Sequence, residues 1–123
     1  MEIKKILVAD DDKNIRDALS YILEEEGYRL WKAKDGAEAL RKVKNSRPDI
    51  VFLDIMMPEL NGYDLCRIIK NDPDLKKTYV IMLTAQDQVD EREHGKEVGA
   101  DDYIVKPFSP KEILAIIKKL QSS

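Results

Sequence analysis

Four short, nearly continuous apolar runs divide this chain, and each is followed at once by a polar residue. The runs are ILVA at residues 6–9, IVFL at 50–53, VIML at 80–83 and YIV at 103–105. Aliphatic runs of this length that alternate with helical patterns are typical of parallel strands buried on both faces. The residues that follow them are Asp10, Asp54, Thr84 and Lys106. Because ligands of open parallel sheets bind at the carboxyl ends of the strands, these four side chains are predicted to gather at one edge.

Helical patterns separate the runs, and a further strand is expected at residues 29–33. The first helix is predicted to follow Asp12, whose carboxylate can cap free amide groups. The helix expected over residues 87–99 has only Val89 and Val98 as clear apolar anchors, so we predict that it is the least firmly packed. The chain therefore predicts an α/β fold with five strands and five helices in strict alternation. The buried faces of the other helices are predicted to be Ile15, Ala18, Leu19, Ile22 and Leu23; Ala37, Leu40 and Val43; Leu65, Ile68 and Ile69; and Ile113, Ile116, Ile117 and Leu120.

Composition indicates one compact domain over residues 1–123. The chain is 43% hydrophobic and 37% charged, and a chain of 123 residues can bury one core but not two. Its net charge of −3, with both signs interspersed, predicts neither a nucleic-acid surface nor a membrane surface. We expect a cytoplasmic protein, because the chain has no apolar stretch of the roughly 18 residues that span a bilayer and no signal-peptide pattern. A single cysteine, Cys66, fits a reducing compartment.

Three carboxylates, those of Asp10, Asp11 and Asp54, are expected at neighbouring strand ends. Like charges within several ångströms of one another cannot all remain ionised without a counter-charge, so a cation is expected there. Oxygen ligands with no His or Cys nearby in the sequence favour Mg²⁺, which keeps some of its waters and shares its coordination with phosphate groups. For Asp12 a plainer alternative stays open, that of a solvated residue capping the following helix.

Asp54 is a candidate nucleophile. It ends a buried strand and is followed by a loop rather than at once by a helix, so helix capping does not explain it. A carboxylate can attack phosphorus and form an acyl phosphate when a metal offsets the accumulating charge and other groups hold the phosphoryl oxygens. Thr84, the backbone N–H of Ala85 and Lys106 could be such groups. A strand threonine or a surface lysine alone would indicate little, but together at strand ends they predict a phosphoryl site.

These residues, in this order, closely resemble the receiver domain of two-component response regulators, of the chemotaxis-regulator type. Thr84 follows Asp54 by 30 positions and Lys106 follows Thr84 by 22, which is the usual spacing of that family. The resemblance covers essentially the whole chain and implies a doubly wound (βα)5 fold with a flavodoxin-like, five-stranded parallel sheet of order 2-1-3-4-5. The matching residues are Asp10-Asp11, Asp54, Met57-Pro58, Gly62, Thr84-Ala85, Tyr103 and Lys106-Pro107.

The resemblance also implies the roles of the acidic residues. Asp54 would accept a phosphoryl group from the phosphohistidine of a sensor histidine kinase or phosphotransfer protein. Asp11, Asp54 and the backbone carbonyl of Met56 would bind Mg²⁺ directly, and Asp10 would bind it through water. The chain would then be a self-phosphorylating and self-dephosphorylating switch rather than an enzyme that turns over a substrate.

The resemblance assigns a second set of residues to the switch. Thr84 and Lys106 would contact the phosphoryl group, and Tyr103 would turn inward when Thr84 is drawn toward the phosphate. Lys106 and Pro107 would be joined by a cis peptide bond, which only proline makes accessible at low cost. Because the helix expected over residues 89–98 has few apolar anchors, we further predict that the face made by this helix, the strand at Tyr103 and the terminal helix docks a downstream effector protein or domain.

A phosphatase of the haloacid dehalogenase type is the strongest alternative, because it also uses an aspartate nucleophile and Mg²⁺. Its motifs would be assigned to Asp10, Asp12, Thr84, Lys106 and Asp101-Asp102. In that family, however, the lysine precedes the second acidic pair, whereas here Lys106 follows it. Asp54 would also be left without a role, so the order of the motifs disfavours this alternative.

Two further alternatives are also disfavoured. In a flavodoxin-like cofactor binder, the acidic loop at residues 10–12 would repel the flavin phosphate. A degenerate receiver that serves only for docking would not need the intact acids, Thr84 and Lys106.

Three other residues are interpreted more plainly. His94, the only histidine, lies among charged residues of the expected fourth helix and is typical of a solvated side chain rather than a phosphoryl carrier. Cys66 lies beside an apolar stripe and is predicted to be a packed thiol. Trp31 lies in the expected edge strand and is interpreted as a cover for the core, with a partner surface as the alternative.

Overall fold

The structure is a computed structural model, and it describes residues 1–85 and 98–122. The described helices have 10 to 13 residues, and none of them is long and apolar enough to cross a membrane. The helix expected over residues 87–99, including Val89 and His94, lies outside the described residues except for its last two positions. The elements in chain order are β1 (Lys5–Ala9), α1 (Lys13–Glu25), β2 (Arg29–Ala33), α2 (Gly36–Ser46), β3 (Ile50–Asp54), α3 (Gly62–Asn71), β4 (Tyr79–Thr84), β5 (Asp102–Val105) and α5 (Pro110–Gln121).

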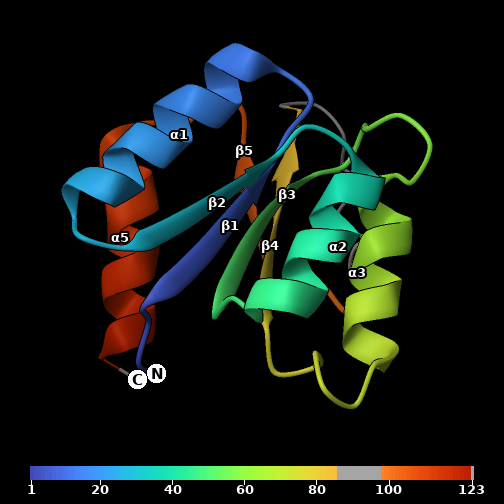
Figure 1. The fold of residues 1–123 in the computed structure, drawn as a ribbon. Helices are drawn as coiled ribbons and strands as arrows, with labels where there is room; N and C mark the ends of the chain where they lie inside the picture. Colours follow the sequence, from blue (N-terminus) through green and yellow to red (C-terminus); the bar gives the residue numbers. More distant parts are fainter. Residues whose placement is uncertain (86–97, 123) are drawn as a thin grey trace.

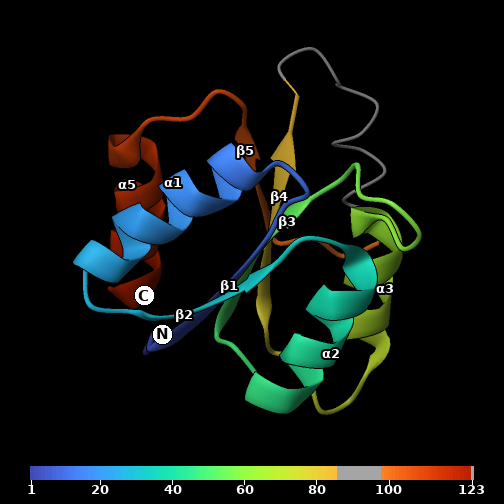
Figure 2. The ribbon, with the colours of Figure 1, turned by 45° about the horizontal axis from the view of Figure 1, so that its top comes forward.

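Five strands form one parallel sheet in the order β2-β1-β3-β4-β5, which confirms the predicted fold class and strand order. Helices α1 and α5 cover one face of the sheet, and α2 and α3 cover the other (Figure 1). Figure 2 shows the same two layers from a second direction, with the sheet between them. Parallel strands that are covered in this way on both faces need apolar side chains at successive positions.

The central strand β3 shows why its sequence is a continuous apolar run. The side chains of residues 50–53 are all fully buried. Val51 and Leu53 belong to the core beneath α2 and α3, whereas Ile50 and Phe52 belong to the core beneath α1 and α5. Because successive strand residues point to opposite faces, each face of β3 receives two of these side chains. The strand therefore carries Asp54 to the edge of the sheet from a fully packed support.

Three of the predicted helix faces are correct except at one position each, where Ala18, Ala37 and Ile68 are exposed. Ala37 is exposed while Ala39 is buried, and Ile68 is 36% exposed while Cys66 is fully buried. In α2 and α3 the buried face starts at the first residue, which is a glycine. Gly36 packs tightly against the β3–α3 loop, and Gly62 packs tightly against the end of β3. The face then continues at helical spacing from that glycine, which selects Ala39 and Cys66.

Other expectations about local structure are confirmed. Asp12 caps α1, since its Oδ1 accepts hydrogen bonds from the backbone N–H groups of Asn14 at 2.9 Å and Ile15 at 3.4 Å. Trp31 in the edge strand β2 is half-buried and packs against the core beneath α2 and α3, with the guanidinium carbon of Arg29 5.2 Å from its ring centroid. The thiol of Cys66 is buried, and burial raises its pKa to about 11.

Close backbone contacts hold the loop of residues 55–61 that follows β3. A Cβ atom on Gly62 would lie 2.4 Å from the carbonyl oxygen of Asp54 and 2.9 Å from the Cα of Ile55. A Cβ atom on Gly36 would lie 1.9 Å from the carbonyl oxygen of Leu60. The backbone N–H of Gly62 also donates to the carbonyl of Ile55 at 2.9 Å. Glycine at these two positions lets the loop turn back beside the end of β3.

We expect Gly62→Ala to destabilise the fold by about 1–3 kcal/mol, because the added methyl group meets backbone atoms that cannot move aside. The measurement is urea unfolding of the purified protein. Gly27→Asn is the matched control: Gly27 has φ +93°, nothing lies within 4 Å of its would-be Cβ, and Asn tolerates this region of φ. A loss in Gly62→Ala no larger than that in Gly27→Asn would contradict the steric explanation.

Candidate functional site

The register of the sheet brings the polar strand ends to one edge. Ala9 pairs with Leu53, Asp54 with Leu83, and Thr84 with Val105, so Asp10 and Lys106 follow strands that end at the same level as Asp54 and Thr84. Three of these four residues are nearly inaccessible: Asp10 is 0% exposed, Thr84 1% and Asp54 6%. The structure thus brings together the four strand-end residues that the sequence singles out.

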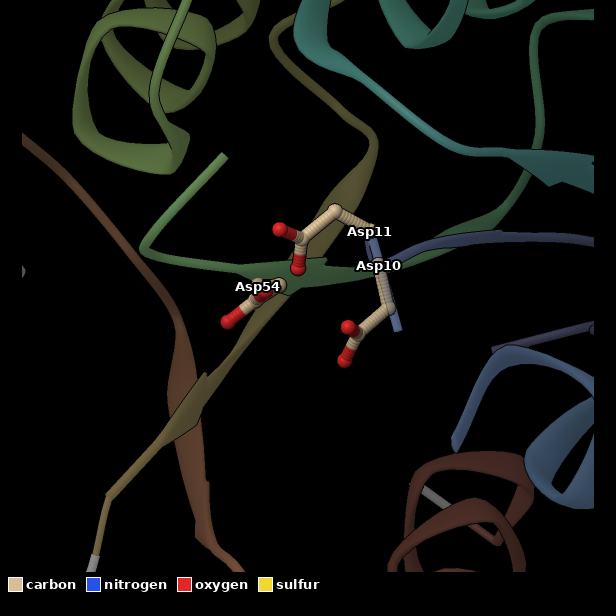
Figure 3. Close-up of side chains that lie close together, drawn as sticks. All are labelled: Asp10, Asp11 and Asp54. Atoms are coloured by element: carbon tan, nitrogen blue, oxygen red, sulfur yellow. The ribbon is translucent and has the colours of Figure 1, made fainter. Parts of the chain in front are cut away.

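Three acids meet at this edge (Figure 3). Asp10, Asp11 and Asp54 each offer a carboxylate oxygen, and these three oxygens lie within 4.8 Å of one another. Asp10 and Asp54 are buried, whereas Asp11 is exposed. The cluster is therefore supported by packed strands on one side and open to water at Asp11.

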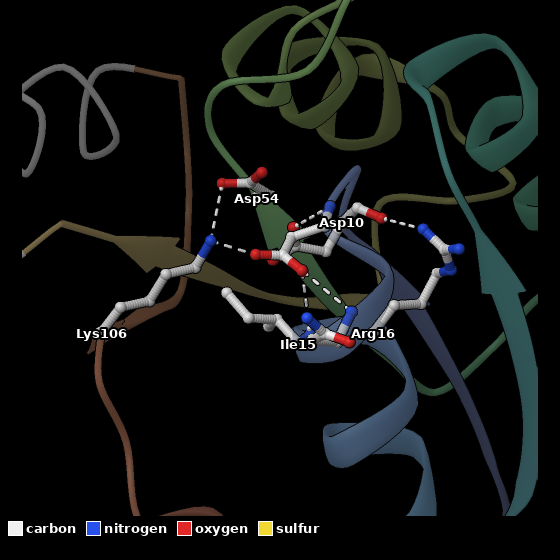
Figure 4. A network of polar contacts seen from close by, with 7 residues as sticks. Asp10, Ile15, Arg16, Asp54 and Lys106 are labelled. Atoms are coloured by element: carbon white, nitrogen blue, oxygen red, sulfur yellow. Dashed lines mark hydrogen bonds and ion pairs between the residues drawn. The ribbon is translucent and has the colours of Figure 1, made fainter.

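Lys106 connects two of the acids. Its Nζ lies 2.9 Å from Oδ2 of Asp10 and 3.2 Å from Oδ1 of Asp54 (Figure 4). The contact with Asp10 is an ion pair rather than a well-aligned hydrogen bond, because no donor among the described residues has good geometry toward Oδ2 of Asp10. Lys106 is itself held by its backbone N–H, which donates to the carbonyl of Thr84 at 2.7 Å. The Lys106–Pro107 peptide bond is cis, as the family resemblance implies.

Burial and crowding of charge change the proton affinity of this cluster. Burial, and after it the negative charge of Asp10, raise the pKa of Asp54 to about 7 from its ordinary 3.8, although Lys106 acts in the opposite direction. Burial alone would lower the pKa of Lys106, but its contacts with Asp10 and Asp54 outweigh this, and its pKa lies above the ordinary value. One ammonium therefore does not neutralise the three acids.

The donor set fits a hard divalent cation. All three ligand atoms are carboxylate oxygens, and one oxygen of Asp10 is buried without an aligned donor. Octahedral Mg²⁺ with bonds of about 2.1 Å separates opposite ligands by about 4.2 Å, which is compatible with oxygens within 4.8 Å of one another. The exposed position of Asp11 leaves room for the waters that Mg²⁺ retains.

Thr84, Tyr103 and Met56 lie at or within two residues of the ends of β4, β5 and β3, and their roles stay predictions. Thr84 Oγ1 donates to the carbonyl of Ala85 at 3.4 Å. Tyr103 is half-buried and packs against the core beneath α2 and α3. Met56 lies in the loop after β3 and is 67% exposed.

Arg16 makes a contact at the site that the sequence analysis does not predict. Its Nη1 donates to the backbone carbonyl of Asp10 at 2.8 Å. The only signal in the sequence is a basic residue one turn into a helix that follows an acidic loop, and this signal is weak because such residues are usually solvated.

The sequence profile of the response regulator receiver domain matches residues 6–118. The chain belongs to this family. Protein PilG of Pseudomonas aeruginosa is 44% identical over 114 residues, which is 93% of this chain and 84% of PilG. The alkaline phosphatase synthesis transcriptional regulatory protein PhoP of Bacillus subtilis is 43% identical over 95% of this chain. The receiver domain described here spans 48% of PhoP, about half of its length.

Solved structures agree with this assignment. A putative response regulator from Chloroflexus aurantiacus has a TM-score of 0.92 and 33% identity, covering 99% of this chain and all of that one. The chemotaxis response regulator CheY4 of Vibrio cholerae has a TM-score of 0.89 and 33% identity, covering 97% of this chain and 99% of its own. The resemblance to receiver domains of the chemotaxis-regulator type is thereby confirmed.

The pKa of Asp54 predicts how the stability of the metal-free receiver domain depends on pH. Between pH 4 and 7 the folded state holds a proton on Asp54 that the unfolded state has lost, so this residue makes stability fall as pH rises. The slope is at most about 1.4 kcal/mol per pH unit. We expect Asp54→Asn, which stays neutral, to gain stability relative to the parent protein from pH 5 to pH 8. Urea unfolding in a chelator measures this difference, and a constant difference across that range would contradict it.

Proposed function

We propose that this receiver domain accepts a phosphoryl group on Asp54 from the phosphohistidine of a sensor histidine kinase or phosphotransfer protein, with Mg²⁺ as cofactor. The observation that supports this proposal best is the pairing of Asp54 with Lys106 at 3.2 Å, beside two further acids at metal-binding distance. A structural ion pair alone would not need three acids for one ammonium. The arrangement suits a site that takes up both a cation and an anion.

In the proposed reaction, a carboxylate oxygen of Asp54 attacks phosphorus and forms a P–O bond. The P–N bond of the phosphohistidine breaks, and the imidazole leaves with the electron pair. When bound, Mg²⁺ would offset the charge of the three carboxylates and of the phosphoryl oxygens. Lys106, which already contacts Asp54, would follow the new negative charge and hold a phosphoryl oxygen. Each event modifies the protein itself, so we propose a switch rather than a turnover enzyme.

The proposed readout starts at Thr84, one strand away from Asp54. In this proposal its hydroxyl would donate to a phosphoryl oxygen. Thr84 pairs with Val105 in β5, two residues beyond Tyr103. A shift of Thr84 toward Asp54 would open space for the Tyr103 ring and bias the domain between two states. We propose that this change alters the docking of a downstream effector.

We also propose a cytoplasmic location for the protein, supported by the single free thiol.

Phosphorylation of Asp54 can be tested directly by intact mass. With acetyl phosphate and Mg²⁺, we expect the mass to rise by one phosphoryl group, about 80 Da. The rise should vanish in Asp54→Asn. It should persist in the control Asp12→Asn, which changes an acid of the neighbouring loop but keeps a residue that can cap α1. A persistent rise in Asp54→Asn, mapped to another residue, would overturn the assignment.

Metal binding can be tested through stability. A ligand that binds only the folded state stabilises it by about 2.7 kcal/mol at a hundredfold excess over its dissociation constant. We therefore expect Tm to rise with Mg²⁺. Asp11→Asn should melt at a higher temperature without metal, because one like charge is lost, and should respond less to Mg²⁺. The same Mg²⁺ response in Asp11→Asn as in the parent protein would reject Asp11 as a direct ligand.

A further inference from the structure

Arg16 contacts the acidic loop of residues 10–12, which is also held by hydrogen bonds of its own. The backbone N–H of Asp12 donates to Oδ1 of Asp10 at 2.9 Å, and Asp12 in turn caps α1. Arg16, in the first turns of α1, then reaches back with Nη1 to the carbonyl oxygen of Asp10 at 2.8 Å. Figure 4 shows Arg16 on the opposite side of Asp10 from Lys106. The two cations therefore differ in what they contact: Lys106 binds carboxylates, and Arg16 binds backbone.

The carbonyl that Arg16 contacts belongs to the peptide unit between Asp10 and Asp11. Because a peptide unit is planar, fixing the direction of its carbonyl also fixes the direction of the Asp11 N–H. The other end of Asp10 is fixed by its own N–H, which donates to the carbonyl of Ala33 in β2 at 3.1 Å. Together with the Asp12 N–H contact to Asp10, the Arg16 hydrogen bond thus helps to hold the backbone where it leaves β1 and where Asp11 begins.

We propose that Arg16 is a positioning residue of the metal site, whose hydrogen bond to the Asp10 carbonyl holds Asp10 and Asp11 in the arrangement that binds Mg²⁺. The inference rests on the proposed Mg²⁺-dependent function and adds a residue to it. Groups that orient metal ligands from outside the coordination shell typically contribute about 10–100-fold to metal affinity. Arg16 is suited to this task because its guanidinium stays charged and its acceptor is not itself one of the three carboxylates.

Whether loss of Arg16 weakens or tightens Mg²⁺ binding distinguishes a positioning role from a purely electrostatic one. A guanidinium near the acids repels a divalent cation, so loss of its charge alone would tighten Mg²⁺ binding. Loss of the hydrogen bond would weaken binding, because Asp10 and Asp11 would have to be ordered when the ion binds. A variant that removes both the charge and the hydrogen bond therefore reports which effect is larger.

The experiment is calorimetric titration of the purified receiver domain with Mg²⁺ alone. We expect Arg16→Met to weaken Mg²⁺ binding by about tenfold, the lower end of the range for such orienting groups. Lys13→Met is the matched control: it removes a positive charge from the same end of α1, where Lys13 contacts Asp17 at 2.8 Å rather than the Asp10 carbonyl. This control should bind Mg²⁺ as tightly as the parent protein or more tightly.

Two further measurements address a merely structural role. In phosphorylation by acetyl phosphate, Arg16→Met should raise the Mg²⁺ concentration for half-maximal rate, while the rate at saturating Mg²⁺ stays within about twofold, because Arg16 contacts no reacting atom. In the metal-free protein, amide hydrogen exchange at Asp12 should be faster in Arg16→Met but unchanged in Lys13→Met.

Arg16→Lys decides the question if Arg16→Met fails to fold. Lysine keeps the charge but lacks the planar fork and is shorter, so we expect it to bind Mg²⁺ more weakly than the parent protein does. Parent-like affinity in Arg16→Lys, or parent-like or tighter affinity in a folded Arg16→Met, would overturn the role of Arg16. If the parent protein itself binds no Mg²⁺, the proposed function fails and this inference fails with it.

Discussion

Two buried carboxylates, Asp10 and Asp54, share one ammonium, and the arrangement of the strand ends depends on that contact. A buried charge that loses its partner costs about 3–5 kcal/mol, so Lys106 cannot leave the pair without another partner taking its place. Lys106 follows β5, Asp10 follows β1 and Asp54 ends β3, with β4 lying between β3 and β5. The contact therefore links three strand ends across the sheet. Any anion or cation that enters the cluster changes the charge balance between Lys106 and the two carboxylates.

The rest of the fold holds Asp54 rigidly beside Asp10 and Lys106. Strand β3 is buried on both faces, and Gly62 brings the following loop against the backbone of Asp54 and Ile55. Asp54 consequently has little freedom to relieve crowding by moving away from Asp10. Burial, and after it the negative charge of Asp10, therefore raise the pKa of Asp54, because taking up a proton is the remaining way to lower the charge.

Much of the fold could be predicted from the sequence, because buried parallel strands leave a direct signature in apolar runs. The strand order came from the family resemblance, and the gathering of Asp54, Thr84 and Lys106 followed from the strand ends. Single positions of the helix faces could not be predicted reliably. In α3, Cys66 and Ile68 fit an apolar stripe about equally well, and a backbone contact of Gly62 decides between them. The contact of Arg16 with the Asp10 carbonyl was also missed, because a side chain that binds backbone leaves no pattern of residue types.

The partners at the site are far apart along the chain. Lys106 and Asp54 are separated by 52 positions, and the strand that leads to Lys106 is the last of the five to be synthesised. A growing chain thus contains the three acids well before it contains the ammonium that balances them. Non-local contacts of this kind form only when the intervening segments have already been arranged. The contact of Lys106 with Asp54 therefore forms only on completion of the sheet, and the chemistry proposed for Asp54 would require the fully folded domain.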